Sequence, residues 1–307
     1  MSTISVIIPA YNAERTIIKT VESVIQQTFS DFEIIVIDDG STDRTLELLR
    51  DIKDNRLKIF SYENGGLPVA RNRGIARATG EFISFIDADD LWTPDKLELQ
   101  LAALQQNSEA GVAYSWTAYF IDGREESIFP YNPVFFEGNV YDKLLVNNFV
   151  ASGSNILARK KAIESVGKFE PTLKSCEDWD YYIRLAAKWH FVLVPQHQIL
   201  YRQSLNTMTS KVEIMEKEAL RVIERAYQSA PPEYQFLKNR SLAWIYQYCT
   251  QQYLKNSTDI STVKKASQKF WTAIRLHPQM LLGNYARILT KSLIIKWLKE
   301  ARSLVFK

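Results

Sequence analysis

The first hundred residues repeat one pattern, in which a short apolar run is followed by a polar loop and then by apolar residues at helical spacing. The apolar runs that we expect to form buried strands are Ser5–Pro9, Phe32–Ile37, Leu57–Ser61 and Phe82–Ile86. The fourth run precedes a helix expected over Pro94–Gln106. Strands that alternate with helices form a mostly parallel sheet with helices on both faces, joined by right-handed crossovers. The sequence therefore predicts an α/β fold.

Three carboxylates follow the fourth apolar run, where Gly80–Asp90 reads GEFISFIDADD. In an open α/β sheet, ligands bind at the carboxyl ends of the strands, which is where Asp87, Asp89 and Asp90 are expected. Oxygen ligands of this kind favour Mg²⁺ or Mn²⁺, and a weakly held ion of this type usually accompanies a substrate diphosphate. The alternative is a polar turn that caps the following helix, and Asp90 alone is sufficient for that purpose.

The character of the chain changes after residue 110. An aromatic-rich strand is expected over Val112–Ile121 and two short strands over Phe191–Pro195 and Gln198–Arg202, whereas Asp122–Pro133 is turn-rich and irregular. After about Ser210 the strand signals end, and helices are expected over Val212–Tyr227, Glu233–Leu254, Thr262–Leu276 and Asn284–Phe306. We therefore expect a domain over residues 1–209, with halves at 1–110 and 111–209, and a helical region over 210–307.

Composition restricts the partners and the compartment. The formal net charge of +3 is small for a nucleic-acid-binding protein, which usually carries a concentrated basic face. Cys176 and Cys249 form no metal-binding or redox spacing, which favours a reducing cytosol. The N-terminus lacks the pattern of a signal peptide, and no stretch reaches the roughly 18 consecutive apolar residues of a membrane span. We therefore expect a cytoplasmic protein that does not bind nucleic acid.

The last predicted helix is amphipathic and basic. Its apolar side holds Leu293, Ile294, Trp297, Leu298, Ala301, Leu304 and Val305, and Lys296, Lys299, Arg302 and Lys307 lie toward the other side. Such a helix either packs its apolar face on the protein and leaves its lysines in water, or lies peripherally on an anionic membrane surface, here the inner face of the cell membrane. The sequence leaves both alternatives open, and it leaves the oligomeric state unknown.

Five segments occur in a characteristic order: SVIIPAYN (Ser5–Asn12), VIDDGSTD (Val36–Asp43), NGGLPVARNRGIA (Asn64–Ala76), GEFISFIDADD (Gly80–Asp90) and CEDWD (Cys176–Asp180). Together they resemble the family 2 glycosyltransferases with the GT-A fold, over roughly the first 205 residues. The resemblance implies a GT-A-type sheet flanked by helices, with the C-terminal all-helical extension outside it. It also implies a nucleotide-binding half at 1–110 and an acceptor half at 111–209.

The activity that the resemblance implies is an inverting, metal-dependent transfer of a sugar. The donor is expected to be a nucleoside-diphosphate sugar, most simply one linked to UDP, and the acceptor a hydroxyl of a polysaccharide, a lipid-linked glycan or another glycoconjugate. The alternative is a catalytically inactive module of the same fold that binds a nucleotide or glycan. The intact carboxylates argue against this second function.

On the donor side, the resemblance implies that Asp89 contacts a bound Mg²⁺ or Mn²⁺ ion and that Asp87 contacts the ribose or the metal. Ala88 is small enough for the turn to approach the diphosphate, and Asp39 matches the position that hydrogen-bonds the base. The other implied donor contacts are Pro9, Ala10, Tyr11, Glu14, Gly65 and Arg71. Structural alternatives exist: an Asx-turn for the Asp39 loop, a core position for Tyr11 and a solvated helix face for Arg71.

On the acceptor side, the resemblance implies that Asp178 is the general base and that Glu177 is its orienting neighbour. The alternative is that both carboxylates complement the dipole of a helix N-terminus. Trp179 would stack on a sugar or belong to the core. The residues expected to shape the acceptor side are Ser152, Gly153 and Ser154.

The chain departs from the family at one position. Family members often carry a histidine, which helps to hold metal or diphosphate, where Ser204 stands here. The metal site would then depend on Asp89 and the diphosphate alone, or Arg202 would carry part of the phosphate charge.

Overall fold

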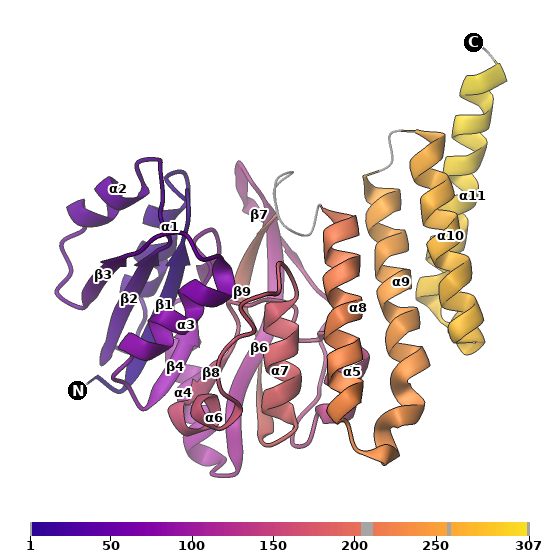
Figure 1. Ribbon diagram of the computed structural model, residues 1–307. Coiled ribbons are helices and arrows are strands. Elements are labelled where there is room, and N and C mark those ends of the chain that lie inside the picture. Colours follow the sequence, from indigo (N-terminus) through magenta and orange to yellow (C-terminus); the bar gives the residue numbers. More distant parts are fainter. Residues whose placement is uncertain (1, 204–210, 257–258, 306–307) are drawn as a thin grey trace. The chain divides into compact units, whose positions relative to one another are not determined.

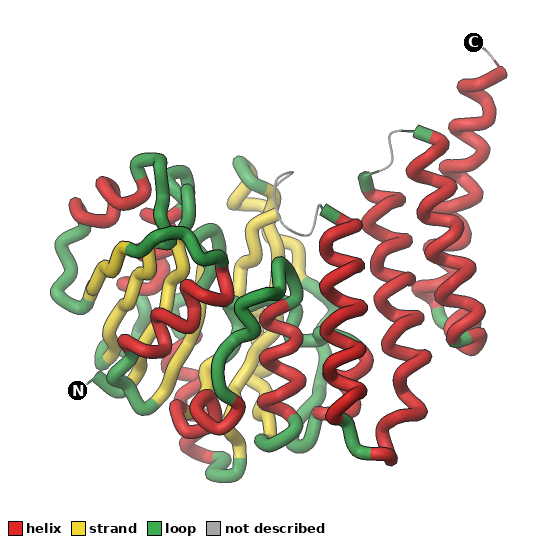
Figure 2. The backbone as a smooth tube through the Cα atoms, viewed as in Figure 1, coloured by secondary structure: helices red, strands yellow, loops and turns green. Residues whose placement is uncertain are grey.

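The computed structural model describes residues 2–203, 211–256 and 259–305, with side chains described up to residue 299 (Figure 1). The chain divides into two compact units, one of residues 1–144 with 148–204 and the other of 145–147 with 205–307. The first unit contains the sheet and the second is helical where it is described (Figure 2). Ser204, at the position of the family histidine, lies outside the described residues.

The first unit is built on a nine-stranded mixed sheet. The strands are β1 (Ile4–Ala10), β2 (Phe32–Asp38), β3 (Leu57–Ser61), β4 (Phe82–Phe85), β5 (Leu91–Trp92), β6 (Ala110–Ile121), β7 (Arg124–Pro130), β8 (Leu157–Arg159) and β9 (His190–Gln203). Their order is β3-β2-β1-β4-β8-β6-β9-β5, and β7 pairs with β6. The four strands β1 to β4 pair in parallel, whereas β8 is antiparallel to both β4 and β6. The predicted α/β class is confirmed, and the parallel arrangement holds for the N-terminal half of a mixed sheet.

Helices cover both faces of the parallel strands. The helices of this part of the chain are α1 (Ile17–Ile25), α2 (Thr45–Asp51), α3 (Leu67–Arg77), α4 (Lys96–Gln106), α5 (Tyr141–Val146), α6 (Lys160–Val166) and α7 (Glu177–Ala186). Every residue of β1 is buried, as expected of a strand with both faces covered. Ile8 of β1 packs in one core with apolar residues of α1 and α4. On the opposite face, a Cβ at Gly74 of α3 would lie 2.3 Å from Ile7, so this glycine lets α3 approach the sheet closely.

Two local predictions are wrong. The segment expected to be irregular, Asp122–Pro133, contains strand β7. Exposed and half-buried residues alternate along the first part of this strand, and the strand pairs only with β6. The two short strands expected after residue 190 are one strand, β9, because the chain continues through Pro195 with shifts in its pairing register to β6. A proline at such an irregularity removes no regular ladder hydrogen bond, so it does not end the strand.

A lysine lies in the core of the first unit. Lys96 opens α4 and is fully buried, with its Nζ 2.5 Å from Ser84 Oγ and 3.9 Å from the centroid of the Trp92 ring. Burial lowers its pKa well below the ordinary value of 10.5. Burial removes the hydration of this amine, which donates a hydrogen bond to Ser84 Oγ and lies over the ring of Trp92.

Replacing Lys96 by Met is expected to stabilise the protein by about 1–3 kcal/mol near neutral pH, because Met fills a similar volume without an ionisable group. Because burial lowers the pKa of Lys96 in the folded chain, the unfolded chain binds more protons in the pH range between that lowered pKa and 10.5, so wild-type stability rises with pH across this range. The difference in unfolding free energy between Lys96→Met and the wild-type protein should therefore decrease as pH approaches 10.5. Denaturant unfolding at several pH values tests this, with Lys53→Met at an exposed position as the control. An equal gain at every pH would contradict it.

The second unit packs helices against one another. Its helices are α8 (Val212–Ser229), α9 (Lys238–Lys255), α10 (Ile260–Leu276) and α11 (Asn284–Val305), with short 3₁₀ helices at η2 (Pro232–Leu237) and η3 (Pro278–Leu282). α9 contacts α8, α10 and α11. Ion pairs from Lys269 to Glu216 and from Lys265 to Glu213 link α10 to α8. Within the described ranges, every helix falls short of the length and apolar character needed to cross a lipid bilayer.

Candidate active site

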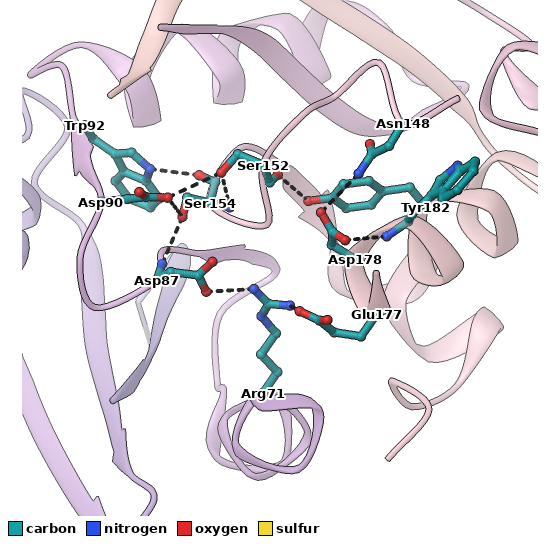
Figure 3. Close-up of polar contacts among 11 residues, drawn as sticks. Arg71, Asp87, Asp90, Trp92, Asn148, Ser152, Ser154, Glu177, Asp178 and Tyr182 are labelled. Carbon is teal, nitrogen blue, oxygen red and sulfur yellow. Dashed lines mark hydrogen bonds and ion pairs between the residues drawn. The ribbon is translucent and has the colours of Figure 1, made fainter. Parts of the chain in front are cut away.

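A buried guanidinium joins three segments that lie far apart in the sequence. Arg71, on α3, is only 1 % exposed. Its Nη2 donates to Asp87 Oδ1 at 2.7 Å, and its Nη1 donates to Glu177 Oε1 at 2.6 Å (Figure 3). Arg71 thus connects the carboxylates that follow β4 with those that open α7. The alternative that Arg71 occupies a solvated helix face is wrong.

The charge of Arg71 is fixed by its surroundings. Burial by itself lowers the pKa of the guanidinium, but the carboxylates of Asp87, Glu177 and Asp178 raise it above the ordinary value. The Nε atom is buried and has no hydrogen-bond partner among the described residues. Arg71 is therefore a permanent cation between two acidic groups.

Gly153 makes room for this cation. A Cβ at position 153 would lie 2.3 Å from Arg71 Nη2 and 3.3 Å from Asp87 Oδ2. A side chain at position 153 would therefore displace the Arg71 guanidinium from its contact with Asp87. The resemblance implies that Gly153 helps to shape the acceptor side, and the structure places it directly against the Arg71–Asp87 pair.

The neighbouring serines hold a buried carboxyl group. Asp90 Oδ2 accepts a hydrogen bond from Ser154 Oγ at 2.6 Å, and Ser152 Oγ lies 3.4 Å away (Figure 3). Asp90 Oδ1 accepts from the backbone N–H of Arg202 at 3.0 Å. Burial, followed by the nearby charges of Asp89 and Asp87, raises the pKa of Asp90 well above its ordinary value. Ser152 and Ser154 thus support the loop of the carboxylates, and their predicted contact with an acceptor stays a prediction.

Asp87 and Asp89 provide partly exposed carboxylates at the end of β4. Burial, followed by repulsion from Asp87, raises the pKa of Asp89 to about 6. The described part of the chain contains no cluster of three or more His, Cys, Asp or Glu side chains that would hold a metal by itself. A divalent cation here would need oxygen ligands from a diphosphate or from water, which is the usual arrangement for Mg²⁺. The partly exposed carboxylate oxygens of Asp87 and Asp89 fit such an ion.

Arg202 lies beside this loop. Its Nε donates to the backbone carbonyl of Asp89 at 2.8 Å, and its Nη1 donates to Asp122 at 2.8 Å and Glu125 at 3.0 Å. Its Nη2 is buried and has no hydrogen-bond partner among the residues that the structure describes. Arg202 therefore has a buried N–H group without a described partner beside the loop that holds Asp89.

Asp178 lies at the start of α7 and is only partly buried. Its Oδ2 accepts from Asn148 Nδ2 at 3.1 Å, and its Oδ1 accepts from the backbone N–H of Trp179 at 2.8 Å (Figure 3). Burial raises the pKa of Asp178, and the Arg71 guanidinium opposes that shift. Burial likewise raises the pKa of Glu177 to about 7. A carboxylate held in a fixed orientation with a raised pKa is suited to accepting a proton near neutral pH.

Trp179 belongs to the core. Its side chain is buried, and Nε1 donates to the backbone carbonyl of Leu144 at 2.7 Å. Of the two alternatives that the sequence leaves open, the structure has the core position. The predicted stacking of Trp179 on a sugar is therefore not supported by its exposure.

The predicted donor residues lie at the end of β1, on the loops after β1, β2 and β3, on α3 and after β4. Asp39 is buried, and its carboxylate accepts from the backbone N–H groups of Gly65 and Gly66 and from Arg73 Nη1 at 2.6 Å. Tyr11 is 54 % exposed, so its core alternative is wrong. The remaining predicted contacts are Pro9 and Ala10, both buried in β1, and Glu14, which is exposed and accepts from the backbone N–H of Arg44.

Three backbone positions adjoin these residues. Among the described residues other than glycine, positive φ angles occur at Asn12 (48°), Ala151 (68°) and Cys176 (60°). Asn12 follows Tyr11, Ala151 precedes Ser152, and Cys176 precedes Glu177. Left-handed residues other than glycine are uncommon and cluster at functional sites. The sequence gives no signal for them, nor for Asn148, which orients Asp178.

The sequence of this chain is similar to those of known glycosyltransferases. The model of the family described as "Glycosyltransferase like family 2" matches residues 5–256. A putative teichuronic acid biosynthesis glycosyltransferase, TuaG from Bacillus subtilis, is 34 % identical over 192 residues, which cover 60 % of this chain and 72 % of TuaG. WfgD from Escherichia coli, named UDP-Glc:alpha-D-GlcNAc-diphosphoundecaprenol beta-1,3-glucosyltransferase, is 40 % identical over 106 residues, which cover 34 % of this chain and 42 % of WfgD. The chain spans only 30 % of an uncharacterized glycosyltransferase of Rickettsia felis, with 37 % identity over 187 residues.

Solved structures show the same fold. S. aureus TarS 1-349, in complex with UDP-GlcNAc, has a TM-score of 0.57 at 19 % identity, covering 90 % of this chain and 92 % of that chain. The mannosyltransferase PcManGT from Pyrobaculum calidifontis, in complex with GDP-Man and Mn²⁺, has a TM-score of 0.60 at 16 % identity, covering 97 % of this chain and 87 % of that chain. At these identities the likeness concerns the fold.

Proposed function

This chain belongs to family 2 of the glycosyltransferases, and from that premise we propose that it transfers a sugar from a UDP-linked donor to an acceptor hydroxyl with inversion. One observation carries the proposal. Arg71 brings the carboxylates after β4 and those at the start of α7 to the two ends of one guanidinium. The site thus has an acidic group for a cation and diphosphate on one side and a proton acceptor on the other.

Asp89 and Asp87 would hold the divalent cation. When bound, Mg²⁺ or Mn²⁺ supplies positive charge against the negative charge that develops on the departing diphosphate. The Mn²⁺ and GDP-Man of the PcManGT complex support this assignment. Arg202, whose Nη2 has no partner in the described part of the chain, would donate to the diphosphate from the same side.

Asp178 would accept the proton of the acceptor hydroxyl as that hydroxyl attacks the anomeric carbon. An attack opposite the departing diphosphate inverts the anomeric centre. Asn148 and the backbone of Trp179 hold the carboxylate in place, and Glu177 fixes it relative to Arg71. Asp39 would also accept a hydrogen bond from the base of the nucleotide. The lone pairs of its carboxylate that are not bonded to Gly65, Gly66 or Arg73 would make this contact.

The donor nucleotide and the acceptor class follow from relatives. The UDP-glucose in the name of WfgD and the UDP-GlcNAc in the TarS complex support a UDP-linked donor. The diphosphoundecaprenol in the name of WfgD and the teichuronic acid in that of TuaG support a lipid-linked or polysaccharide acceptor. A cytoplasmic location, peripheral at the inner face of the cell membrane, is the one that we propose with this activity.

Binding of UDP with Mn²⁺ is expected to raise the melting temperature by about 5 °C, because a ligand at about 100 times its Kd stabilises the folded state by about 2.7 kcal/mol. Asp89→Asn should remove most of the shift, since the cation loses its carboxylate. Asp142→Asn, an exposed carboxylate on α5, is the matched control and should retain it.

Measuring the release of free sugar from a panel of UDP-sugars then shows whether the protein is an active enzyme or the inactive binding module. A melting shift without hydrolysis of any donor in the panel would favour the module. The absence of any shift with UDP and Mn²⁺ would contradict the proposed donor.

A further inference from the structure

Helix α11 has two apolar faces, of which only one is buried. Ala286, Leu289 and Leu293 lie at intervals of three and four residues and are buried in the second unit, where α11 contacts α10 and α9. Trp297 Nε1 donates to Ser267 Oγ of α10 at 2.9 Å and thereby extends the same contact. Of the apolar residues that the sequence places on one side of this helix, Leu293 is buried, whereas Ile294 and Leu298 are exposed.

The second apolar face points into solvent. Ile288, Ile295 and Leu298 are 60 %, 54 % and 57 % exposed. Ile288 follows the buried Ala286 by two residues, which rotates it by about 200° around the helix axis. Lys291 and Lys299, both exposed, follow Ile288 by three and eleven residues and therefore lie on the same face. We call these five residues the outer face of α11.

The charged side chains that the structure describes on α11 are all basic. The stretch from Pro278 to Lys299 contains Arg287, Lys291, Lys296 and Lys299 and no aspartate or glutamate. Leu282 on the preceding η3 helix is also strongly exposed. Single exposed apolar side chains are normal on protein surfaces, but an apolar stripe that alternates with lysines indicates a binding surface.

The charge decides which partner fits. A second copy of this chain, docked through the same face, would bring lysines against lysines without a compensating carboxylate on the face. An anionic lipid surface satisfies both features, because its headgroups attract the lysines while the apolar side chains enter the boundary between headgroups and acyl chains.

We infer that the outer face of α11 docks the protein on a membrane surface rich in anionic lipid. Ile288, Ile295 and Leu298 would insert and Lys291 and Lys299 would contact the headgroups. The inference stands on α11 alone, and it rests on the proposed function only in placing a lipid-linked acceptor at the same membrane.

Sedimentation of the full chain with lipid vesicles tests the inference. The protein should bind vesicles of phosphatidylglycerol and phosphatidylcholine in equal parts, bind vesicles of phosphatidylcholine alone only weakly, and dissociate at about 1 M salt, where charges are screened beyond about 3 Å. Lys291→Glu/Lys299→Glu should lower affinity at least about 25-fold, because each basic residue contributes about fivefold at an anionic surface. Ile288→Ser/Ile295→Ser/Leu298→Ser should lower it at least about tenfold.

Two controls keep the result specific. Lys217→Glu/Lys264→Glu removes the same charge from exposed positions on α8 and α10 and should retain most of the binding. The melting shift with UDP and Mn²⁺ should be the same in all three variants, so that loss of membrane binding is distinct from failure of the proposed activity.

Two outcomes would overturn the inference. One is an equal loss of vesicle binding in Lys217→Glu/Lys264→Glu and in Lys291→Glu/Lys299→Glu. This result would indicate that the total charge of the protein, and not the outer face, causes the binding. The other is a wild-type protein that ignores anionic vesicles but forms a dimer that the serine variant abolishes, which would assign the face to a second copy of the chain.

Discussion

Asp178→Asn is expected to lower the rate of sugar transfer by about 10²- to 10⁴-fold, the usual contribution of a general base. Asparagine preserves the size of the side chain and can still accept from Asn148 or Trp179, but it cannot take the proton of the acceptor. The donor contacts proposed for Asp87 and Asp89 remain in place. Transfer from the active UDP-sugar to acceptor should therefore be lost while the melting shift with UDP and Mn²⁺ persists.

The pH dependence provides a second measurement on Asp178. Burial raises the pKa of this carboxyl, so activity of the wild-type protein should fall as pH decreases, starting above the range usual for aspartate. The residual activity of the asparagine variant should not show this fall at low pH. Asp142→Asn is the control for the loss of one carboxylate. Transfer at the wild-type rate by Asp178→Asn would eliminate Asp178 as the base.

Arg71→Met is expected to destabilise the fold by about 3–5 kcal/mol, because it leaves two carboxylates without their buried cation. Asp87 and Glu177 are bonded to Arg71 at 2.7 and 2.6 Å, and Arg71 itself is almost completely buried. Lysine at position 71 should recover only part of the loss, since one ammonium cannot present two parallel donors to two carboxylates. Denaturant unfolding of both variants measures the difference.

The surface pair Arg44–Glu47 supplies the control for Arg71. Arg44 is about two-thirds exposed, so Arg44→Met should leave the stability almost unchanged. Removing Glu177 together with Arg71, as Arg71→Met/Glu177→Gln, should recover part of the lost stability because fewer unpaired charges stay buried. Equal losses at positions 71 and 44 would show that the bridge contributes little to the fold.

The sequence predicts the N-terminal half of the sheet well because each of its strands is mostly apolar and is bounded by polar loops. Leu57–Ser61 is predicted with its exact bounds, and Phe32–Ile37 to within one residue. The strands of the second half are less visible. β8 has only three residues, and β7 is a polar strand with a single neighbour, so neither carries the apolar signal of a buried strand.

For the site, the sequence identifies the acidic residues better than their partners. Short motifs mark Asp87, Asp89 and Asp178 because the spacing within each motif is local. The bond from Arg71 to Glu177 joins residues 106 positions apart, and no local pattern reports it. The same limit applies to Asp39, whose partners Gly65 and Arg73 lie on a different loop and helix.

Gly153 has a consequence for attempts to alter this protein. The atom that any other amino acid would add at this position falls where the Arg71 guanidinium already stands. Mutant libraries designed to broaden acceptor tolerance should therefore keep position 153 constant. A substitution there would disturb the pairing of Arg71 with Asp87, and screening would record it as a loss of activity rather than as a new specificity.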